Sequence, residues 1–342
     1  MQVQENFSLK DYNSFGITAN ARYFSAIRSI TELQEVLAWH RRQPALILGG
    51  GSNILLTKDV DGLVIRNEMK GISKVQEDDN AVYLKSGAGE NWHSLVQYTI
   101  NNDLGGLENL SLIPGNVGAS PMQNIGAYGV ELKDVFHELT AFNLEEKTNY
   151  IFRTKDCAFG YRDSVFKNKY KGQFLITDVT FRLSKKPVFH IEYGAIRKEL
   201  ESMGITEPGL RTISQAIINI RTSKLPDPKQ IGNAGSFFKN PSVTREQFDL
   251  LKSSWPELVG YVNDDGSVKL AAGWLIEHSG PVEGISWKGY REGDAGVHIA
   301  QALVLVNHGA ATGEEIFNLS TRIMESVNEK FGVQLEREVN IL

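Results

Sequence analysis

The residues with the clearest chemical potential in this chain are uncharged and stand in glycine-rich segments. The longest of these is 111–129, SLIPGNVGASPMQNIGAYG, which holds no charged residue. Glycine at this density disfavours a helix and lets a ligand or another segment approach the backbone closely. The N–H groups of such a loop can hold an anion such as a pyrophosphate. A simple turn between two elements is the alternative interpretation.

Three shorter segments share this character. Residues 49–53 (GGGSN) follow a predicted strand at 45–48, a common context for binding phosphate. They do not form the dinucleotide fingerprint, because Ile54 stands where its third glycine is needed, and they lack the Lys-Ser/Thr pair of a P-loop. Residues 86–89 and 232–236 complete the set. The four segments together indicate a large, extended ligand that carries phosphate groups.

Isolated polar residues near these segments are candidates for chemistry, and each also has an ordinary structural explanation. Arg162 can pair with Asp163, and the Ser236 hydroxyl can belong to a turn. Lys224 can oppose a helix dipole, and Glu338 can face water from a strand. Neither an HExxH metal motif nor a GxSxG nucleophile motif occurs. Residue spacing alone does not decide between these explanations, and we predict no metal site.

Composition narrows the class of protein. With 342 residues, 41% of them hydrophobic, the chain is long enough for roughly two domains with sizeable cores. The net charge of −5 argues against nucleic acid or an anionic membrane as the main partner. The single Cys157 excludes an intramolecular disulfide, and the first residues lack a signal-peptide pattern. We therefore expect a cytoplasmic protein without membrane spans.

The elements that must position these residues follow from periodicity and caps. Helices are predicted at 30–42, 92–101, 212–225, 245–255, 270–278 and 313–331, the last with a Thr312-x-x-Glu315 capping box and a stop at Gly332. Strands are predicted at 45–48, 62–66, 81–85, 136–144, 150–153, 174–183, 302–307 and 333–342. The Pro226-Asp227-Pro228 stretch is a predicted domain boundary.

Several segments resemble the UDP-N-acetylenolpyruvoylglucosamine reductase family, in order along nearly the whole chain. They are NSFG (13–16), LILGGGSN, SGAGENWH, LSLIPGNVGASPMQNIGAYG, FGYRDSVFK, RTSKLPDP, GNAGSFFKNP, DGSVKLAAGWLIE and LEREV (335–339). The resemblance implies an α+β fold of the vanillyl-alcohol-oxidase type, with two FAD-binding subdomains at 1–70 and at 71–223 plus 333–342. A third, substrate-binding α+β domain is implied at 224–332. Tyr193 resembles the subclass with a tyrosine-bearing loop.

The resemblance also implies site residues. FAD is expected to be held by Gly49, Gly50, Gly51, Ser52, Asn53, Ile54, Pro114, Gly115, Gly118, Ala119, Ser120, Gln123, Asn124, Ile125, Gly126, Tyr128 and Arg221. The substrate is expected to be held by Tyr161, Tyr193, Lys224, Lys239, Asn240 and Gln301. The catalytic residues would be Ser236, Arg162 and Glu338. By register with the motif, Glu338 is favoured over Glu336, although its strand is expected to fray near the end of the sequence.

The implied reaction belongs to peptidoglycan precursor synthesis in a bacterial cytoplasm. NADPH reduces FAD, and a hydride then passes from flavin N5 to the vinyl carbon of enolpyruvyl-UDP-N-acetylglucosamine. Arg162 and Glu338 would stabilise the resulting enolate and Ser236 would protonate it, giving UDP-N-acetylmuramate. A monomer acting on this small-molecule substrate is expected. The alternatives are an alcohol oxidase of the same fold and a nucleotide-binding module without catalysis.

Overall fold

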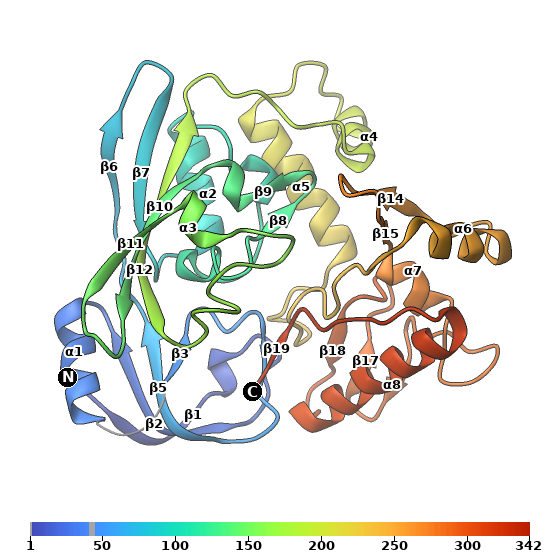
Figure 1. Ribbon diagram of the computed structural model, residues 1–342, viewed down its shortest axis with the longest axis horizontal. Coiled ribbons are helices and arrows are strands. Elements are labelled where there is room, and N and C mark those ends of the chain that lie inside the picture. Colours follow the sequence, from blue (N-terminus) through green and yellow to red (C-terminus); the bar gives the residue numbers. More distant parts are fainter. Residues whose placement is uncertain (1, 41–44) are drawn as a thin grey trace. The chain divides into compact units, whose positions relative to one another are not determined.

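The computed structural model describes residues 2–40 and 45–342, and it divides into two compact units. Unit 1 comprises Met1–Phe7, Asn20–Gly51 and Val60–Ser223, whereas unit 2 comprises Ser8–Ala19, Ser52–Asp59 and Lys224–Leu342. Both units combine helices with sheets (Figure 1). The three-part division drawn from the sequence stays a prediction, and residues 333–342 fall in unit 2. No described helix has the length and apolar character that crossing a membrane requires.

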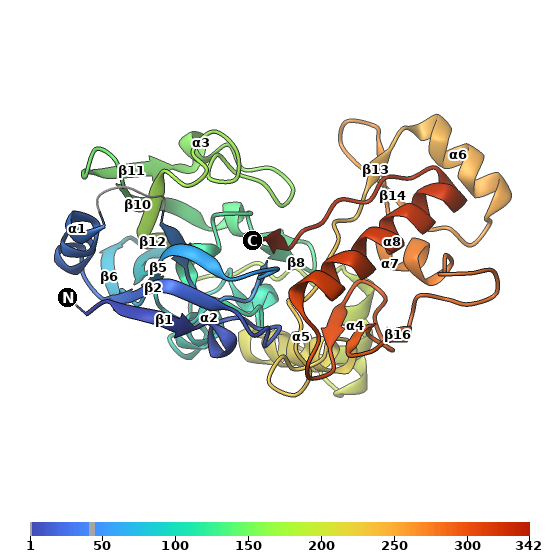
Figure 2. The same cartoon turned by 90° about the horizontal axis from the view of Figure 1, so that it is seen from below.

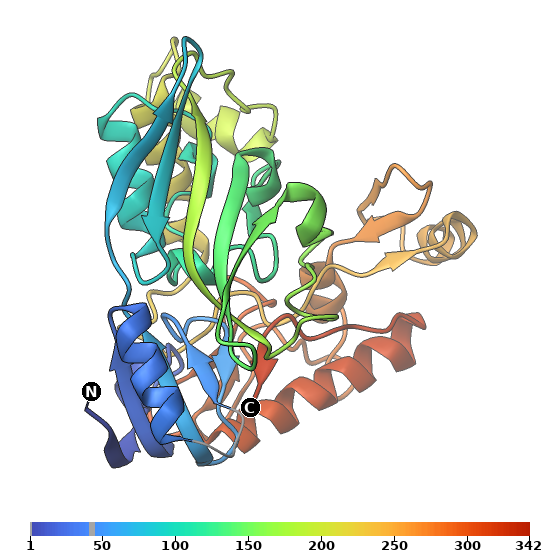
Figure 3. The same ribbon diagram turned by 60° about the vertical axis from the view of Figure 1, so that its left-hand side comes forward.

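The first sheet of unit 1 is built on parallel strands. Its order is β1 (Gln4–Ser8), β2 (Asn20–Ile27), β5 (Val60–Asn67) and β3 (Leu46–Leu48), with β2 and β3 both parallel to β5. Helix α1 (Ile30–Trp39) packs beside β2 and buries Leu33 and Val36 (Figure 3). Ser29 begins the helix by accepting from the Glu32 N–H. The predicted helix end at Arg42 lies outside the described residues.

The second sheet of unit 1 is antiparallel and carries most of the core. Its order is β11 (Asn149–Arg153), β10 (Phe136–Asn143), β12 (Phe174–Ser184), β7 (Ala81–Gly87) and β6 (Ile72–Glu77). Leu175, Val179 and Phe181 on the central strand β12 are fully buried. The Trp92 ring of α2 (Trp92–Asn101) packs edge-on against Phe181. A separate cluster joins α4 (Gly194–Ser202) to α5 (Leu210–Lys224), and α3 (Thr154–Cys157) follows β11.

The glycine-rich segment 111–129 is an ordered loop without an α-helix, as predicted. It contains a single 3₁₀ turn (Val117–Ala119) and ends in a two-strand ribbon of β8 (Gly126–Ala127) and β9 (Val130–Glu131). Asn124 within it is fully buried. The loop is therefore part of the packed structure of unit 1.

Unit 2 contains two small antiparallel sheets and three helices. One sheet has the order β13 (Ser242–Val243), β15 (Val268–Leu270), β14 (Gly260–Val262), and the other β16 (Arg291–Glu292), β17 (Ala295–Val297), β18 (Leu305–Asn307). The helices are α6 (Arg245–Ser254), α7 (Ala272–Glu277) and α8 (Gly313–Phe331). Helix α8 packs against β17 and β18 (Figure 1), and Figure 2 shows the helix along its length. Its predicted capping box at Thr312 and its left-handed stop at Gly332 are confirmed.

The last described residues are held by hydrogen bonds, and the fraying expected from the sequence stays a prediction. Strand β19 (Asn340–Ile341) pairs in parallel with β4 (Ile54–Leu55). The Leu342 carbonyl accepts from the Thr57 N–H at 2.8 Å and from its hydroxyl at 2.7 Å. The predicted strand at 333–342 is shorter than expected, because only 340–341 lie in a named strand. Arg337 adds one isolated bridge to Phe238.

Candidate active site

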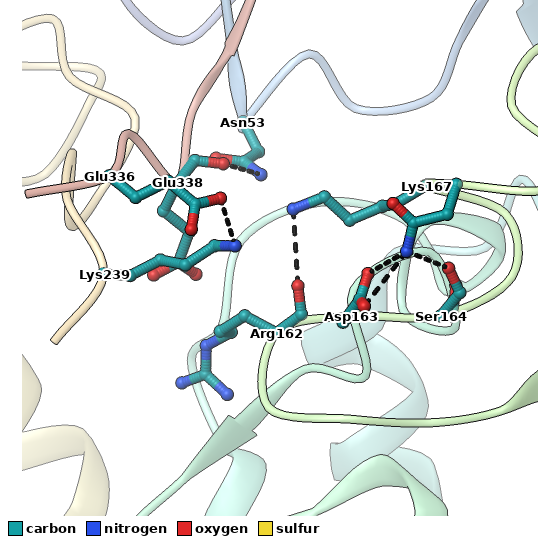
Figure 4. A network of polar contacts seen from close by, with 9 residues as sticks. Asn53, Arg162, Asp163, Ser164, Lys167, Lys239, Glu336 and Glu338 are labelled. Atoms are coloured by element: carbon teal, nitrogen blue, oxygen red, sulfur yellow. Dashed lines mark hydrogen bonds and ion pairs between the residues drawn. The ribbon is translucent and has the colours of Figure 1, made fainter. Parts of the chain in front are cut away.

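Arg162 in unit 1 stands on a tight turn. Gly160 and Asp163 exchange backbone hydrogen bonds at 3.1 and 3.3 Å, and Arg162 between them has a φ of +53°. Its Nη2 donates to the Gly126 carbonyl at 2.5 Å, while its own carbonyl accepts from Lys167 Nζ at 3.3 Å (Figure 4). Asp163 accepts from Asn168 Nδ2 at 2.9 Å. The guanidinium is thus directed at the glycine-rich loop.

Asn124 joins that loop to the Arg162 turn. Its Nδ2 donates to the Gly160 carbonyl at 3.0 Å and to Glu131 Oε2 at 2.9 Å, and its Oδ1 accepts from the Lys133 N–H at 3.0 Å. Asn124 is fully buried and has a φ of +44°, which an Asn tolerates better than most residues. A side chain predicted to hold the cofactor therefore positions the backbone next to Arg162.

Tyr128, Tyr193 and Arg221 form an aromatic and cationic cluster in unit 1. The two tyrosine rings meet edge-on with centroids 5.5 Å apart, and the Tyr128 hydroxyl is hydrogen-bonded to Arg221. Burial raises the pKa of the Tyr128 hydroxyl and lowers the pKa of the Arg221 guanidinium. Arg221 Nε is buried without a hydrogen-bond partner. A buried donor of this kind fits an acceptor atom of a ligand.

His93 supports the start of the glycine-rich loop. Its Nδ1 accepts from the Leu112 N–H at 2.9 Å, which requires Nδ1 to be unprotonated. Burial first, and the Arg221 charge second, lower the pKa of His93. Leu112 has a φ of +58°, so this bond holds a residue in the left-handed region.

Three glycine-rich segments approach one another closely: 111–129 contacts both Gly50 and Ala88. A Cβ on Gly50 would lie 2.9 Å from both Asn116 Oδ1 and the Gly115 Cα, and one on Gly118 would lie 2.5 Å from the Ala88 Cβ. Side chains at Gly50 and Gly118 would therefore push these segments apart. The predicted close approach is present, and its N–H groups suit a pyrophosphate.

A cavity of about 700 Å³ adjoins this contact through Asn116. Its other lining residues include three cations, Arg28, Arg66 and Lys70. Glu68 pairs with Arg28 at 2.8 Å and with Arg66 at 3.2 Å. The cavity lies at the carboxyl ends of the parallel strands β2 and β5, where α/β sheets bind nucleotides. The close approach of the glycine-rich segments, the cavity with its cations and the buried Arg221 donor all fit the binding of a dinucleotide such as FAD.

The sequence did not single out Arg28, Arg66, Lys70 or Asn116. Arg66 ended a predicted strand and Asn116 stood within the quoted motif, but β2, which places Arg28, was not predicted. Ligands bind at the carboxyl ends of parallel strands, but this rule can be applied only when the order of the strands in the sheet is known.

Ser236 in unit 2 is placed by a strand-like ladder. It forms an antiparallel bridge with Val304, and the Phe237 N–H donates to the Leu303 carbonyl at 2.7 Å. Before it, Gly235 has a φ of +71°, and its N–H donates to the buried Asn233 Oδ1 at 3.0 Å. Ser236 thus lies where a glycine turn enters a ladder.

Glu338 and Lys239 lie on two segments that pair side by side. The Glu338 N–H donates to the Phe237 carbonyl at 2.8 Å, and the Lys239 N–H donates to the Glu336 carbonyl at 2.9 Å. Lys239 Nζ also forms an ion pair with the Glu336 carboxylate, and Asn53 Nδ2 donates to the Glu338 carbonyl at 3.4 Å (Figure 4). Unit 2 therefore brings the Ser236 segment, the Glu338 segment and Asn53 together.

The remaining predicted substrate residues have separate settings. Asn240 Oδ1 accepts from the Ala272 N–H at 3.0 Å, at the start of α7, and Gln301 Oε1 lies 3.1 Å from a Cβ built on Gly273. Both residues therefore gather at the beginning of α7. Lys224 is exposed as the last residue of α5, and Tyr161 and Tyr193 are exposed in unit 1. Among the described residues, no cluster suited to a metal ion occurs.

Comparison with known proteins identifies the family. Residues 227–342 match the family of UDP-N-acetylenolpyruvoylglucosamine reductase C-terminal domains. Residues 21–147 match a family of FAD binding domains. The UDP-N-acetylenolpyruvoylglucosamine reductase of Flavobacterium johnsoniae is 50% identical over 343 residues, covering 100% of both chains. That of Pseudomonas syringae pv. tomato is 52% identical over 343 residues, covering 100% of this chain and 99% of the relative.

A solved structure supports the fold independently. The UDP-N-acetylenolpyruvylglucosamine reductase of Thermus caldophilus has a TM-score of 0.67 at 24% identity, covering 100% of this chain and 99% of that one. This likeness confirms the predicted α+β fold, and the match to the FAD binding domain together with the named relatives confirms FAD as the cofactor. Full-length relatives at 50% identity and above settle the family: this chain belongs to the UDP-N-acetylenolpyruvoylglucosamine reductases.

Proposed function

We propose that Arg162, Ser236 and Glu338 act on the substrate in the reaction of this family. The chain is an FAD-containing oxidoreductase that uses NADPH to reduce enolpyruvyl-UDP-N-acetylglucosamine to UDP-N-acetylmuramate, in peptidoglycan precursor synthesis. When bound, FAD takes electrons from NADPH and supplies them to the vinyl group of the substrate. The protein must hold the substrate carboxylate, stabilise the charge that develops on it and add a proton to the α-carbon.

Arg162 binds the enolpyruvyl carboxylate. A guanidinium presents a planar fork that matches a carboxylate and keeps its charge at any working pH. The bond from Nη2 to the Gly126 carbonyl and the turn at 160–163 fix the direction of the fork before substrate arrives. Pre-aligned charge of this kind stabilises an enolate more than a mobile side chain would.

Ser236 donates its hydroxyl proton to the α-carbon, and water returns a proton to the serine oxygen. The ladder around Phe237 and Leu303 fixes the backbone that carries the hydroxyl, and a donor held near the substrate offsets part of the weakness of serine as an acid. Glu338, on the adjoining segment, polarises the developing enolate. The bond between the Glu338 N–H and the Phe237 carbonyl carries this proposal, because the two residues stand on extended segments that pair side by side.

The other predicted site residues have binding roles, either toward FAD or toward the substrate. FAD is held by the predicted set around 49–54 and 114–128 with Arg221, and the cavity lined by Arg28, Arg66 and Lys70 adds cations for its phosphates and ribose. Lys239, Asn240 and Gln301 hold the diphosphate and sugar, together with Tyr161, Tyr193 and Lys224. We also propose that the protein acts as a monomer and that it works in the cytoplasm, where UDP-sugars and NADPH are available.

A single-turnover experiment on Ser236→Ala tests the proposal. Reduction of bound FAD by NADPH should stay near normal, whereas its reoxidation by the enolpyruvyl substrate should slow by roughly 10²–10⁴-fold. Ser253→Ala, an exposed serine on α6, is the control and should change neither rate. Collapse of the first half-reaction, or normal reoxidation, would contradict the role of Ser236. Reoxidation by oxygen faster than by the substrate would point instead to the alcohol oxidase.

A further inference from the structure

We propose that Arg337 is a positioning residue that fixes the Glu338 carboxyl by anchoring the strand register from its opposite face. The proposal rests on the role given to Glu338 above. It concerns a residue that touches neither substrate nor cofactor in the proposed reaction. Its contacts lie within unit 2.

The segment 335–339 alternates between two faces. Leu335 and Val339 are 4% and 3% exposed, and Glu336 between them faces solvent. Since successive side chains in an extended segment point to opposite sides, Arg337 shares the inward face with Leu335 and Val339. Glu336 and Glu338 share the other face. A charged residue therefore stands in the middle of an inward-facing apolar row.

Arg337 is bound to helix α8 by a fork of hydrogen bonds. Its Nε donates to Ser320 Oγ at 2.8 Å, and its Nη2 donates to Thr321 Oγ1 at 2.6 Å. The guanidinium also lies over the Phe317 ring, 4.4 Å from the centroid. Three contacts from one helix turn hold this side chain in a single direction.

Burying the Arg337 guanidinium costs hydration free energy that packing alone does not recover. Burial lowers the pKa of Arg337, and two neutral hydroxyls do not fully compensate a cation for the loss of water. An apolar side chain in this position beside Leu335 and Val339 would lose less hydration free energy on burial. The hydrogen bonds instead supply direction: a slip of one residue would turn Arg337 away from α8 and Glu338 inward. The fork therefore excludes the register in which the carboxyl is buried.

The neighbouring contacts leave the backbone of Glu338 little freedom once the register is set. The backbone of Glu338 donates to Phe237 and its carbonyl accepts from Asn53, so the main chain is held on both edges. Only the side-chain torsions of Glu338 remain. A displacement of about 1 Å at a reacting group can cost roughly 100-fold in rate.

The test compares Arg337→Met with Glu338→Gln and with the double variant. Reoxidation of reduced enzyme by saturating enolpyruvyl substrate should slow by about 10- to 100-fold in Arg337→Met, with little change in substrate KM. Flavin reduction by NADPH should stay within about twofold. The double variant should react no more slowly than Glu338→Gln alone, because the arginine acts through the carboxyl.

Matched variants separate positioning from general damage. Arg322→Met removes an arginine on α8 that pairs with Glu292 and lies over Trp287. It leaves segment 335–339 untouched and should leave both half-reactions unchanged. If Arg337→Met does not fold, Ser320→Ala and Thr321→Val break the same fork from the helix side. Arg337→Lys should recover only part of the rate, because one ammonium cannot reproduce the fork.

Each outcome has one meaning. A slow Glu338→Gln with normal turnover in Arg337→Met and in the two helix variants would overturn the positioning role and leave the role of Glu338 intact. Effects of Arg337→Met and Glu338→Gln that multiply would also overturn it. Normal reoxidation in Glu338→Gln would instead refute the proposed function on which the inference rests.

Discussion

Unit 1 and unit 2 shape the backbone around their candidate residues in different ways. All eight described non-glycine residues with positive φ belong to unit 1: Asn6, Asp103, Leu112, Asn124, Tyr128, Lys147, Ala158 and Arg162. Within the described part of unit 2, every positive φ is at a glycine: Gly16, Gly235, Gly266, Gly284, Gly289, Gly293, Gly309 and Gly332. Left-handed backbone at a residue with a Cβ costs roughly 1–2 kcal/mol.

The location of these residues gives the contrast its meaning. Leu112, Asn124 and Tyr128 lie in the glycine-rich loop, and Arg162 lies in the turn bonded to it. Backbone of this kind persists only where the surroundings enforce it, and it collects at functional sites. Unit 2 instead places Ser236 and Glu338 by ladder hydrogen bonds. We infer that substitutions in unit 1 disturb backbone and chemistry together, while those in unit 2 separate the two.

Among the substitutions in unit 1, Arg162→Lys should have the largest effect on the rate of reoxidation. A lysine keeps the charge but loses both the fork and the bond geometry to Gly126, so reoxidation by the enolpyruvyl substrate should slow by roughly 10²–10³-fold. Stopped-flow absorbance of the flavin measures it. Lys167→Arg, which keeps a donor for the Arg162 carbonyl, is the control. Near-normal reoxidation in Arg162→Lys would remove Arg162 from the mechanism.

A pair of exchanges tests the backbone contrast directly. Ala158, exposed at the end of α3, has a φ of +44°, so Ala158→Gly should stabilise the protein by about 0.5–1 kcal/mol. Gly332 ends α8 with a φ of +63° and open space around it, so Gly332→Ala should destabilise by about 1 kcal/mol. Urea unfolding measures both. Changes of the same sign in the two variants would show that backbone conformation does not control them.

The smallest effect concerns His93 and appears only in a pH series. Its pKa is lowered in the folded chain, so below the ordinary value near 6.5 the unfolded chain binds more protons and the unfolding free energy falls as pH falls. His93→Asn keeps an acceptor for the Leu112 N–H but does not titrate. Between pH 7.5 and 5.5 its stability should fall less steeply than that of the parent chain. Equal slopes would contradict this.

Elements with local signals were predictable from sequence, and those fixed by distant partners were not. Thr312, Glu315 and Gly332 mark both ends of α8 because caps act within a few residues. Strands β1, β2 and β6 were not predicted; β2 exists through pairing with β5, more than thirty residues away in the chain. The 3₁₀ turn at Val117–Ala119 needs its buried surroundings.

The candidate site divides in the same way. Motif resemblance named Arg162, Ser236 and Glu338, and their roles stay predictions. Resemblance did not reveal the fork of Arg337, because the partners Ser320 and Thr321 follow from how α8 packs. The cations at the ends of β2 and β5 also needed the sheet order.

The pairing of β19 with β4 also orders events during synthesis. Thr57 and Leu342 are 285 positions apart, so β4 emerges from the ribosome long before its partner exists. Unit 1 has all its residues once Ser223 is made, whereas unit 2 waits for its last strand. At about 5–20 residues per second, Ser52–Asp59 therefore presents an open strand edge on the nascent chain for roughly ten seconds or more. The segment that later meets Glu338 is therefore open to molecular chaperones for as long as unit 2 is incomplete.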